Sequence, residues 1–328
     1  MRAILVGRYG PAEALELAEV PAPAAAAGEV VIRQSRVGVN FADVYMRRGL
    51  YHGQHTYGTG LPFVLGLEGV GEVVEAGDGV ETLRPGDRVG YCLGKAAYAE
   101  QVAVAAAKCV KLPSWCDDDT AAALMLQGAT SHYLTHSAYP LAAGEWCLIH
   151  AGAGGVGRLL IQIAKAKGAK VITTVGSPAK AAAVAELGAD VVVLYREEDP
   201  VERVREATGG AGVDVVYDSV GRDTIAASLR CLRVRGTCIL FGASSGPVES
   251  VVPMDLAEAG SVFFTRPHLA HYRRAAAEAQ RRADDIFRLV EQGSVKPNID
   301  SVFPLAEAVA AHRRLESRQS AGKILLQP

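Results

Sequence analysis

The sequence predicts an α/β protein that combines a β-rich part with a doubly wound parallel sheet. In residues 28–104, short β-branched runs alternate with Gly and Gly-Asp turns, which is typical of a compact antiparallel barrel or sandwich. From about Asp117, short apolar runs alternate with helical segments, a rhythm typical of a parallel sheet covered on both faces. With 328 residues, the chain is long enough for two domains that each have an apolar core.

The expected elements follow this division in chain order. The β-rich part contains the stretches GEVVIRQSRVGVN, GLEGVGEVVEAGDGV and GDRVGYCLGKAAYAEQVAV. The segment DDDTAAALMLQGATSHYLTHSA predicts a helix, because its acidic start can cap the helix and suits the positive end of its dipole. Six apolar strands are then expected, in EWCLIHAG, KVITTVGS, ADVVVLY, VDVVYDSVG, GTCILFG and SVFFTRP. Near Arg266 the alternation stops, and a further helix is expected around DDIFRLVEQGSV.

The composition favours a globular protein of the cytoplasm without nucleic-acid or membrane partners. The formal net charge of −2 gives no general attraction for nucleic acid or an anionic membrane. No apolar run approaches the roughly 20 residues that a membrane-spanning helix needs. The first residues, MRAILVGRYGPAEALEL, lack the pattern of a signal peptide. The six cysteines form no Cys-x-x-Cys pair and are expected to be buried thiols in a reducing compartment.

A glycine-rich turn predicts a dinucleotide site. The expected strand in EWCLIHAG runs into AGAGGVG and then into the helical RLLIQIAKAKGA, which places Gly152, Gly154 and Gly157 in G-x-G-x-x-G spacing. Such glycines allow a tight turn, close approach of a pyrophosphate to the backbone, and close packing of helix on strand. The free N–H groups at the helix start then face the phosphate. The strand–turn–helix context makes this motif a prediction of a Rossmann-type domain.

The end of the second strand predicts NADPH as the dinucleotide. NAD sites usually place Asp or Glu there, to accept hydrogen bonds from the ribose hydroxyls. In TTVGSPAK, Gly176 and Ser177 occupy that place and Lys180 follows. The missing carboxylate leaves room for a 2′-phosphate, and a lysine can neutralise its charge. The alternative for Lys180 is a solvated lysine at a helix start.

The sequence predicts neither a metal site nor a catalytic nucleophile. Zinc sites need about three converging protein ligands. His132 and His136 have helical i, i+4 spacing, but no Glu lies between them, which favours two partly exposed helix residues. His52 and His55 are expected to be exposed in a loop rich in Gly and Tyr. No metal is therefore expected. No G-x-S-x-G motif suggests acyl transfer, which leaves hydride transfer.

Further motifs resemble the medium-chain dehydrogenase/reductase superfamily. They are G-x-E-x-x-G, at Gly66, Glu68 and Gly69 or Gly71, and GDRV at residues 86–89. Zinc-dependent alcohol dehydrogenases of that superfamily have Gly-His-Glu, with the histidine on the metal. Here Leu67 replaces that histidine, and the family's cysteine ligand is replaced within VGVNFADVY. The chain thus resembles the zinc-free quinone oxidoreductase branch, also called zeta-crystallin-like, and within it the bacterial NADPH:quinone oxidoreductases.

The resemblance covers nearly the whole chain, in VNFADVYMRRGLY, HAGAGGVG, LYREEDPVERVREATGG, VVYDSVGRDT, FGASSG, TRP and LESR. Two departures are Gln127, where some members carry Lys, and the longer loop YHGQHTYGTGLP at residues 51–62. The resemblance implies a GroES-like catalytic domain at residues 1–124 and 266–328 and a Rossmann NADPH-binding domain at residues 125–265. It also implies a homodimer and an acceptor cleft between the domains.

The resemblance implies the following site residues. Asn40, Tyr45, Tyr51, Arg47 and Gln127 would line the nicotinamide and acceptor cleft. The cofactor contacts would be Gly152, Gly154, Gly155, Val156 and Gly157 at the pyrophosphate, Gly176, Ser177, Lys180, Tyr195 and Arg318 at the adenosine 2′-phosphate, and Thr130, Phe241, Ser244 and Arg266 toward the nicotinamide. Without the resemblance, Tyr45 and Tyr51 read equally well as partly buried aromatics, and Arg318 as a solvated charge.

The implied activity is NADPH-dependent quinone reduction without a metal. Negative charge builds on the quinone oxygen, so hydrogen-bond donors there are the useful catalytic groups. Tyr45 and Asn40 are the first candidates, before Tyr51 and Arg47, and water could deliver the final protons. One alternative is an NADPH-dependent enone or enal reductase of the same superfamily.

A second alternative, of another class, is an RNA-binding or structural protein like the crystallins. RNA binding predicts a basic stripe interleaved with aromatic residues. The basic clusters at residues 230–235, 273–274 and 281–282 are short and offset by acidic residues. We interpret them as solvated faces, and nucleic acid is not an expected partner.

Overall fold

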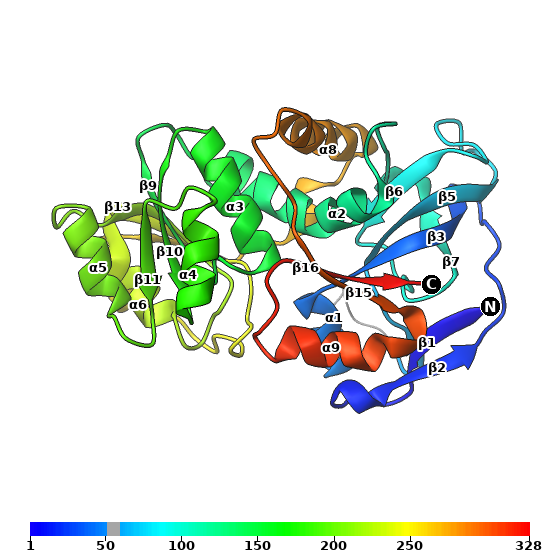
Figure 1. Cartoon of the computed structure of the whole chain (residues 1–328), viewed down its shortest axis with the longest axis horizontal. Helices are drawn as coiled ribbons and strands as arrows, with labels where there is room; N and C mark the ends of the chain where they lie inside the picture. The colour runs from blue at the N-terminus through cyan, green and yellow to red at the C-terminus, as the bar shows by residue number, and fades with distance from the viewer. Residues whose placement is uncertain (51–59) are drawn as a thin grey trace. The chain divides into compact units, whose positions relative to one another are not determined.

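The computed structural model describes residues 1–50 and 60–328. The chain divides into two compact units. Unit 1 comprises Met1–Gly128, Arg273–Arg288 and Pro297–Pro328, and unit 2 comprises Ala129–Tyr272 and Leu289–Lys296. Unit 1 contains antiparallel β-structure and unit 2 a parallel sheet, as Figure 1 shows. The two kinds of architecture predicted from the sequence are confirmed, whereas the predicted domain limits stay a prediction.

Unit 1 is built mainly of short strands, and its last elements come from the C-terminal part of the chain. Helices α2 (Asp118–Tyr133) and α8 (Ala276–Glu291) have residues in both units. The remaining elements of unit 1 are β1 (Arg2–Val6), η1 (Ala12–Ala14), β2 (Leu15–Glu19), β3 (Glu29–Val39), α1 (Phe41–Arg47), β4 (Phe63–Val64), β5 (Glu68–Ala76), β6 (Arg88–Cys92), β7 (Gln101–Ala105), η2 (Ala106–Lys108), β8 (Cys109–Lys111), β15 (Ile299–Pro304), η5 (Leu305–Glu307), α9 (Ala308–Glu316) and β16 (Lys323–Gln327).

Strand β3 is the centre of the larger sheet of unit 1. It pairs antiparallel with β5, β7 and β16, in a sheet of order β15-β16-β3-β5-β6-β8. The predicted antiparallel pairing is confirmed, except that β15 lies parallel to β16. A smaller sheet has the order β2-β1-β4. The sheet therefore holds the C-terminal strand β16 beside the C-terminal half of β3.

The C-terminal segment completes the apolar core of unit 1. Val30, Ile32 and Val37 of β3 are fully buried, and Ile324 and Leu326 of β16 belong to the same cluster. Burial of one such side chain contributes about 1.5–3 kcal/mol. Helix α9 adds its small buried residues to the cluster. The N-terminal strands consequently lack a complete core until α9 and β16 are in place.

Unit 2 alternates strands and helices. Its elements are η3 (Leu134–Ala138), β9 (Trp146–Ile149), α3 (Gly155–Ala166), β10 (Lys170–Val175), α4 (Pro178–Ala185), β11 (Val191–Leu194), α5 (Pro200–Ala207), β12 (Val213–Asp218), α6 (Ile225–Cys231), β13 (Leu232–Leu240), α7 (Pro253–Glu258), β14 (Phe263–Thr265) and η4 (Leu269–Tyr272). All six strands predicted from the apolar runs are present in one sheet.

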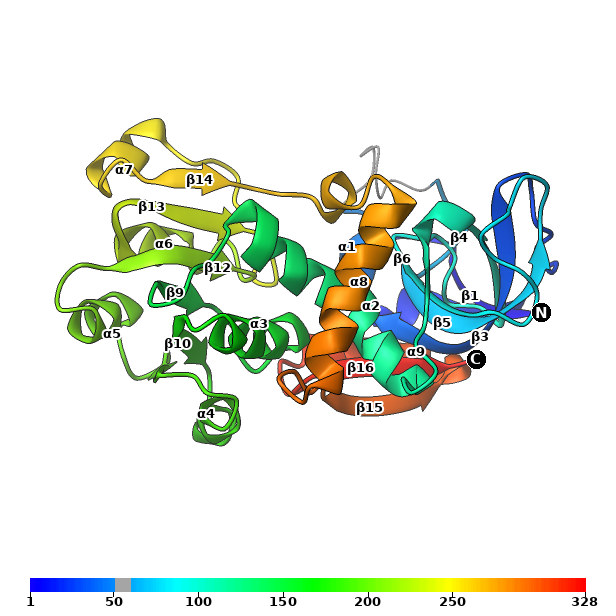
Figure 2. The same cartoon turned by 90° about the horizontal axis from the view of Figure 1, so that it is seen from above.

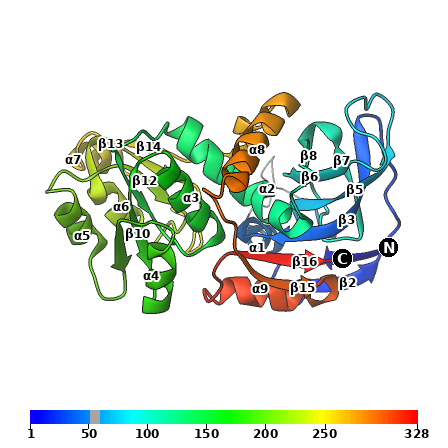
Figure 3. The same ribbon diagram turned by 45° about the horizontal axis from the view of Figure 1, so that its top comes forward.

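The sheet of unit 2 is parallel throughout, with the order β11-β10-β9-β12-β13-β14. Counted from β9, this is the 3-2-1-4-5-6 order of dinucleotide-binding folds. Figure 3 shows α3 and α4 on one face of the sheet and α5 and α6 on the other. Both faces are thus covered, which explains why the central strands are continuous apolar runs. The strand order reverses between β9 and β12, the place where such sheets bind ligands.

The helix predicted over residues 117–138 does not continue in α form to its end. Helix α2 ends at Tyr133, and residues 134–138 form the π-helical turn η3. Within this turn, Thr135 Oγ1 donates to the Ser131 carbonyl oxygen (2.8 Å). Hydroxyl groups that bond to the preceding turn disturb the helical hydrogen-bond ladder. The sequence pattern cannot show this change, because its period persists through the turn.

Helix α1 begins with a capping box inside unit 1. Asn40 is the N-cap residue, and its backbone N–H donates to Asp43 Oδ2 (2.8 Å). The same oxygen accepts a hydrogen bond from Tyr98 Oη (3.1 Å). Asp43 is fully buried, and its Oδ1 has no hydrogen-bond partner in the described part of the chain. Burial raises the pKa of Asp43 to about 7, although the Asn40 N–H and the Lys323 ammonium oppose this rise.

We expect the stability of the wild type relative to Asp43→Asn to fall as the pH rises from about 4 to about 7. In this window an unfolded Asp43, with its ordinary pKa of 3.8, loses its proton while the native carboxyl keeps it. Rising pH therefore favours the unfolded chain, and the variant lacks this titration. The two free energies of unfolding should diverge by up to about 4 kcal/mol.

Urea denaturation of both proteins between about pH 4 and pH 8 measures this difference. Other titrating groups, such as His312, are common to both proteins and cancel. A difference that stays constant with pH would contradict the prediction.

Candidate active site

The glycine loop lies at the carboxyl end of β9 and leads into α3, whose N-cap is Gly154. A Cβ at Gly152 would overlap Thr173 Oγ1, and a Cβ at Gly157 would overlap the Ala151 carbonyl oxygen. These two glycines let the loop and the helix start approach their neighbours closely. A Cβ at Gly154 would instead meet only the Ala151 carbonyl oxygen, at 3.2 Å, and no other atom within 4 Å.

The loop has the properties of a pyrophosphate site. A Cβ at Gly154 would come close to a single backbone oxygen, so the glycine keeps the backbone there accessible at close range. Gly155 and Val156 are the first residues of α3, and N–H groups in a first helical turn have no partner within the helix. With the positive end of the helix dipole, they form a place for an anion. The arrangement fits the pyrophosphate of a dinucleotide.

Both neighbouring strands hold this loop in place. Ala151 has a left-handed backbone, with a φ of 54°, a conformation that is unfavourable for a residue with a side chain. Its N–H donates to Thr174 Oγ1 (3.3 Å), and the Gly152 N–H donates to the Thr174 carbonyl oxygen (3.1 Å). On the other side, the His150 N–H donates to the Tyr217 carbonyl oxygen (3.1 Å). The loop is therefore fixed by β10 and β12 together.

A chain of buried hydrogen bonds fixes His150, which lies just before the glycine loop. Ser228 Oγ donates to Asp218 Oδ2 (2.7 Å), so that it must accept from His150 Nε2 (3.0 Å). His150 Nδ1 then accepts from Thr174 Oγ1 (3.0 Å). Burial lowers the pKa of His150, which keeps the imidazole neutral. The sequence analysis did not identify this chain; the available signal was Asp218 at the carboxyl end of its strand in YDSVGRDT.

The residues predicted for the adenosine end lie at the carboxyl ends of β10 and β11. A Cβ at Gly176 would lie 2.7 Å from Tyr195 Oη, so the glycine leaves room for that ring. Ser177 is the N-cap of α4, and its hydroxyl accepts from the Lys180 N–H (3.5 Å). The structure thus brings these four residues together within unit 2. Arg318 belongs to unit 1 and follows α9, and its place at the 2′-phosphate stays a prediction.

The residues predicted for the nicotinamide end lie in several elements of unit 2. The Phe241 N–H donates to the Asp218 carbonyl oxygen (2.8 Å), and the Ser244 N–H donates to the Ser219 carbonyl oxygen (3.2 Å). The loop after β13 is therefore joined to the loop after β12. Arg266 is exposed beyond β14, and Thr130 is buried on α2. Contacts of these residues with a cofactor stay predictions.

Asn40 is a candidate donor whose side chain is fully engaged within unit 1. Its Nδ2 donates to Glu68 Oε1 (2.6 Å) and to the Gly38 carbonyl oxygen (3.3 Å). Its Oδ1 accepts from Lys323 Nζ (2.9 Å), and Lys323 also forms a buried ion pair with Glu68. Both amide protons thus have acceptors inside the protein. This geometry disfavours Asn40 as a donor to a bound acceptor.

Tyr45 lies on α1, one of the elements predicted to line the acceptor site. It is 8% exposed, and its ring centroid lies 6.2 Å from that of Phe41. Gln127 lies on α2 and is partly exposed. The preceding residue, Leu126, donates its N–H to Glu68 Oε2 (2.6 Å). Tyr51 lies outside the described residues, as do His52 and His55, and their predicted places stay predictions.

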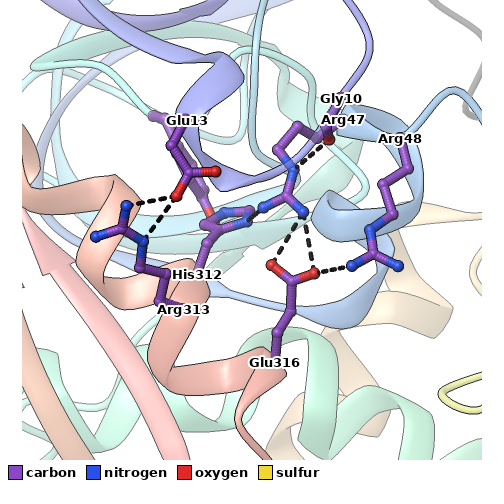
Figure 4. Close-up of polar contacts among 8 residues, drawn as sticks. Gly10, Glu13, Arg47, Arg48, His312, Arg313 and Glu316 are labelled. Carbon is purple, nitrogen blue, oxygen red and sulfur yellow. Dashed lines mark hydrogen bonds and ion pairs between the residues drawn. The ribbon is translucent and has the colours of Figure 1, made fainter.

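Arg47, another candidate donor, has a buried side chain that is held within unit 1. Its side chain is 0% exposed, and its guanidinium contacts Glu316, His312 Nδ1 (2.9 Å) and the Gly10 carbonyl oxygen (3.1 Å), as Figure 4 shows. A buried guanidinium needs such partners to offset its lost hydration. The arrangement does not agree with Arg47 as a donor to an acceptor, because its donors are used within unit 1.

His132 and His136 also differ from the expectation that both are partly exposed. His132 is buried, and its ring stacks on that of His136 at a centroid distance of 4.1 Å. Among the described residues, no three His, Cys, Asp or Glu side chains form a cluster that could hold a metal ion. The groups around the Glu68 carboxylate are an amide and an ammonium, and an ammonium cannot be a metal ligand.

Two family models match the chain. The model described as an alcohol dehydrogenase GroES-like domain matches residues 26–114. The model described as a zinc-binding dehydrogenase matches residues 155–285. In the part of the chain that the structure describes, no helix is long and apolar enough to cross a membrane.

Similar proteins cover the whole chain. Quinone oxidoreductase of Pseudomonas aeruginosa is 42% identical over 321 residues, covering 98% of this chain and 97% of the relative. 2-Haloacrylate reductase of a Burkholderia species is 39% identical over 336 residues, covering 100% and 99%. The crystal structure of Escherichia coli quinone oxidoreductase complexed with NADPH is 40% identical, with a TM-score of 0.96 and coverage of 100% of both chains. The chain therefore belongs to the quinone oxidoreductase family of the medium-chain dehydrogenase/reductase superfamily.

Proposed function

We propose that the chain is an NADPH-dependent quinone oxidoreductase that works without a metal ion. The observation that carries the proposal is the glycine loop at the carboxyl end of β9, which leads into the first turn of α3, in a chain that resembles quinone oxidoreductases over its full length. The absence of a carboxylate in GSPAK after β10 supports NADPH over NADH. The amide and ammonium around Glu68 support metal independence.

The proposed cofactor contacts divide between its two ends. The loop at residues 152–157 would hold the pyrophosphate, and Ser177, Lys180 and Tyr195, with Arg318 from unit 1, would surround the 2′-phosphate. When bound, NADPH supplies a hydride. At the other end we propose Thr130, Phe241, Ser244 and Arg266 as contacts of the nicotinamide.

The proposed task of unit 1 is to stabilise the charge that develops on the acceptor oxygen. A preorganised hydrogen-bond donor at such an oxygen is commonly worth about 3 kcal/mol. We assign this role to the Tyr45 hydroxyl on the resemblance to quinone oxidoreductases; Asn40 and Arg47 use donors within the protein. Gln127 and Tyr51 are proposed as further lining residues. No side chain needs to act as a general acid, since water can deliver the protons.

A second candidate function is reduction of an activated carbon–carbon double bond. The 39% identity to 2-haloacrylate reductase over the whole chain favours it. Such a reaction uses the same cofactor site, and the acceptors differ only in the group that receives the hydride. The two candidates are therefore distinguished by acceptor kinetics.

We also propose a homodimer formed through the β14 edge of the unit 2 sheet. Figure 2 shows β14 and α7 at this edge. Four large apolar side chains are exposed here, namely Val234 in β13, Val252 at the N-cap of α7, Met254 in α7 and Phe263 in β14. An edge strand with exposed apolar neighbours is a ready surface for a second copy. We propose a cytoplasmic location as well, which the six buried free cysteines support.

The test of the proposed function is oxidation of NADPH and NADH by 1,4-benzoquinone, followed at the absorbance of the reduced nicotinamide with and without a chelator. We expect rapid oxidation of NADPH in both cases and little oxidation of NADH. Faster turnover of 2-chloroacrylate or acrolein than of the quinone would establish the second candidate. Failure to bind NADPH would contradict both.

Lys180→Ala should weaken NADPH binding about tenfold and leave NADH binding unchanged, because only NADPH carries the 2′-phosphate. The matched control is Lys170→Ala, which removes the same charge at the opposite end of β10, where the ammonium lies over Trp146. Fluorescence titration gives both dissociation constants. An equal loss for the two dinucleotides would rule out the phosphate contact.

Tyr45→Phe should lower kcat/KM for 1,4-benzoquinone about 100-fold while NADPH binding stays the same, since one donor to the developing charge is removed. Tyr139→Phe serves as the control, because that hydroxyl donates to Glu145 on the surface of unit 2. Steady-state kinetics with saturating NADPH measures the effect. A kcat/KM within about twofold of wild type would show that the Tyr45 hydroxyl does not act in the reaction.

Phe263→Asp should convert the dimer into a monomer, because a charge would then lie in the proposed apolar interface. Leu17→Asp, at an exposed apolar position on β2 in unit 1, is the control and should remain a dimer. Light scattering after gel filtration measures the mass of each protein. A dimeric Phe263→Asp variant would place the interface elsewhere.

A further inference from the structure

The C-terminal end of α1 is held by two side chains of α9. Arg47 Nη2 donates to both carboxylate oxygens of Glu316 (3.0 and 2.9 Å), and Arg47 Nη1 donates to His312 Nδ1 (2.9 Å). His312 and Glu316 are four residues apart on α9, so they lie on the same face of that helix. Figure 4 shows both side chains directed at the Arg47 guanidinium. Arg47 and His312 are both fully buried.

The same histidine also reaches the N-terminal end of α1. His312 Nε2 lies 3.0 Å from Tyr98 Oη, and the two rings meet edge to face. Tyr98 Oη then donates to Asp43 Oδ2, the oxygen that also accepts from the Asn40 N–H in the capping box. His312 is therefore linked to the last residue of α1 directly and to its first turn through Tyr98.

The directions of the two hydrogen bonds of His312 are fixed by chemistry. A guanidinium only donates, so His312 Nδ1 must be the acceptor of the bond from Arg47. The proton of the neutral ring then lies on Nε2 and is donated to Tyr98 Oη. The Tyr98 proton is directed to Asp43. One tautomer of His312 thus satisfies both neighbours, and burial, with Arg47 as a lesser cause, lowers the pKa of His312 to about 3 and keeps it neutral.

We propose that His312 is a positioning residue that holds both ends of α1 and thereby places Tyr45 at the acceptor. The proposal rests on the proposed function, because it assigns Tyr45 to the acceptor oxygen. Helix α1 has only seven residues, and so short a helix has little stability of its own. Displacement of a reacting group by about 1 Å can cost a large part of the rate. His312, which lies 265 positions from Arg47 in the chain, therefore contributes to the reaction rate as well as to the structure.

The experiment compares His312→Phe, which removes both hydrogen bonds, with His312→Gln, whose amide can accept from Arg47 and donate to Tyr98. In His312→Phe we expect amide hydrogen exchange of residues 41–47 to accelerate about tenfold or more. We expect kcat/KM for 1,4-benzoquinone to fall about tenfold or more, with the dissociation constant of NADPH within about twofold of wild type. His312→Gln should restore both properties to within about threefold.

A double-mutant cycle tests whether His312 acts through Tyr45. If it does, His312→Phe should lower kcat/KM little further in a Tyr45→Phe background, because the group that it positions is already absent. Additive losses would overturn the proposal. Arg313→Gln is the matched control, since Arg313 is the next residue on α9 and makes an exposed ion pair with Glu13. It should behave as wild type in both measurements.

Failure of the positioning role and failure of the proposed function give different experimental results. If His312→Phe does not fold, Tyr98→Phe removes the hydrogen bonds to both Asp43 and His312, leaves the contact of His312 with Arg47, and should accelerate exchange at the first turn of α1. Unchanged exchange in folded variants would overturn the positioning role whatever the acceptor is. If the wild type reduces no quinone, the proposed function fails, while hydrogen exchange still decides whether His312 holds α1.

Discussion

A buried contact between the Lys323 ammonium and the Glu68 carboxylate joins β16, the last strand of unit 1, to β5. The two charges lie 255 residues apart in the chain and are almost completely excluded from solvent. Each needs the other, because a lone buried charge would be strongly destabilising. Glu68 also orients the Asn40 amide and accepts the Leu126 N–H of α2. The start of α1, the start of β16 and part of α2 are consequently arranged around one ion pair.

The sequence predicted the fold well where the signal was local. Each strand of unit 2 is a continuous apolar run, such as KVITTV in β10, because helices cover both faces of the sheet. In unit 1 the alternation of β3 predicted a strand, but not that this strand pairs with three others. The order of its partners depends on contacts between distant segments, as with Leu326 beside Val37. Such contacts leave no pattern in a single stretch of sequence.

The candidate site shows the same division between local and distant information. The glycine loop was predictable because its glycines, strand and helix are adjacent in the chain, and each glycine has its own steric reason. Arg47 was expected at the acceptor because its motif contains other site residues, whereas its partners His312 and Glu316 come from α9. The chain from Asp218 to His150 was missed for a similar reason. Its members have no distinctive pattern in the sequence and come together only when β9, β10, β12 and α6 are packed in the fold.

The return of α9 and β16 to the core of unit 1 also sets the order in which the chain can acquire structure during synthesis. Most of unit 2 lies in one continuous stretch, Ala129–Tyr272, that leaves the ribosome before the last segment of unit 1 exists. Unit 2 can therefore fold before Lys323, which neutralises Glu68, has been synthesised. The apolar residues of β16 that complete the core of unit 1 are also still absent at that stage. In the cell, the β-rich half of the newly made protein is thus the part that depends longest on protection from aggregation.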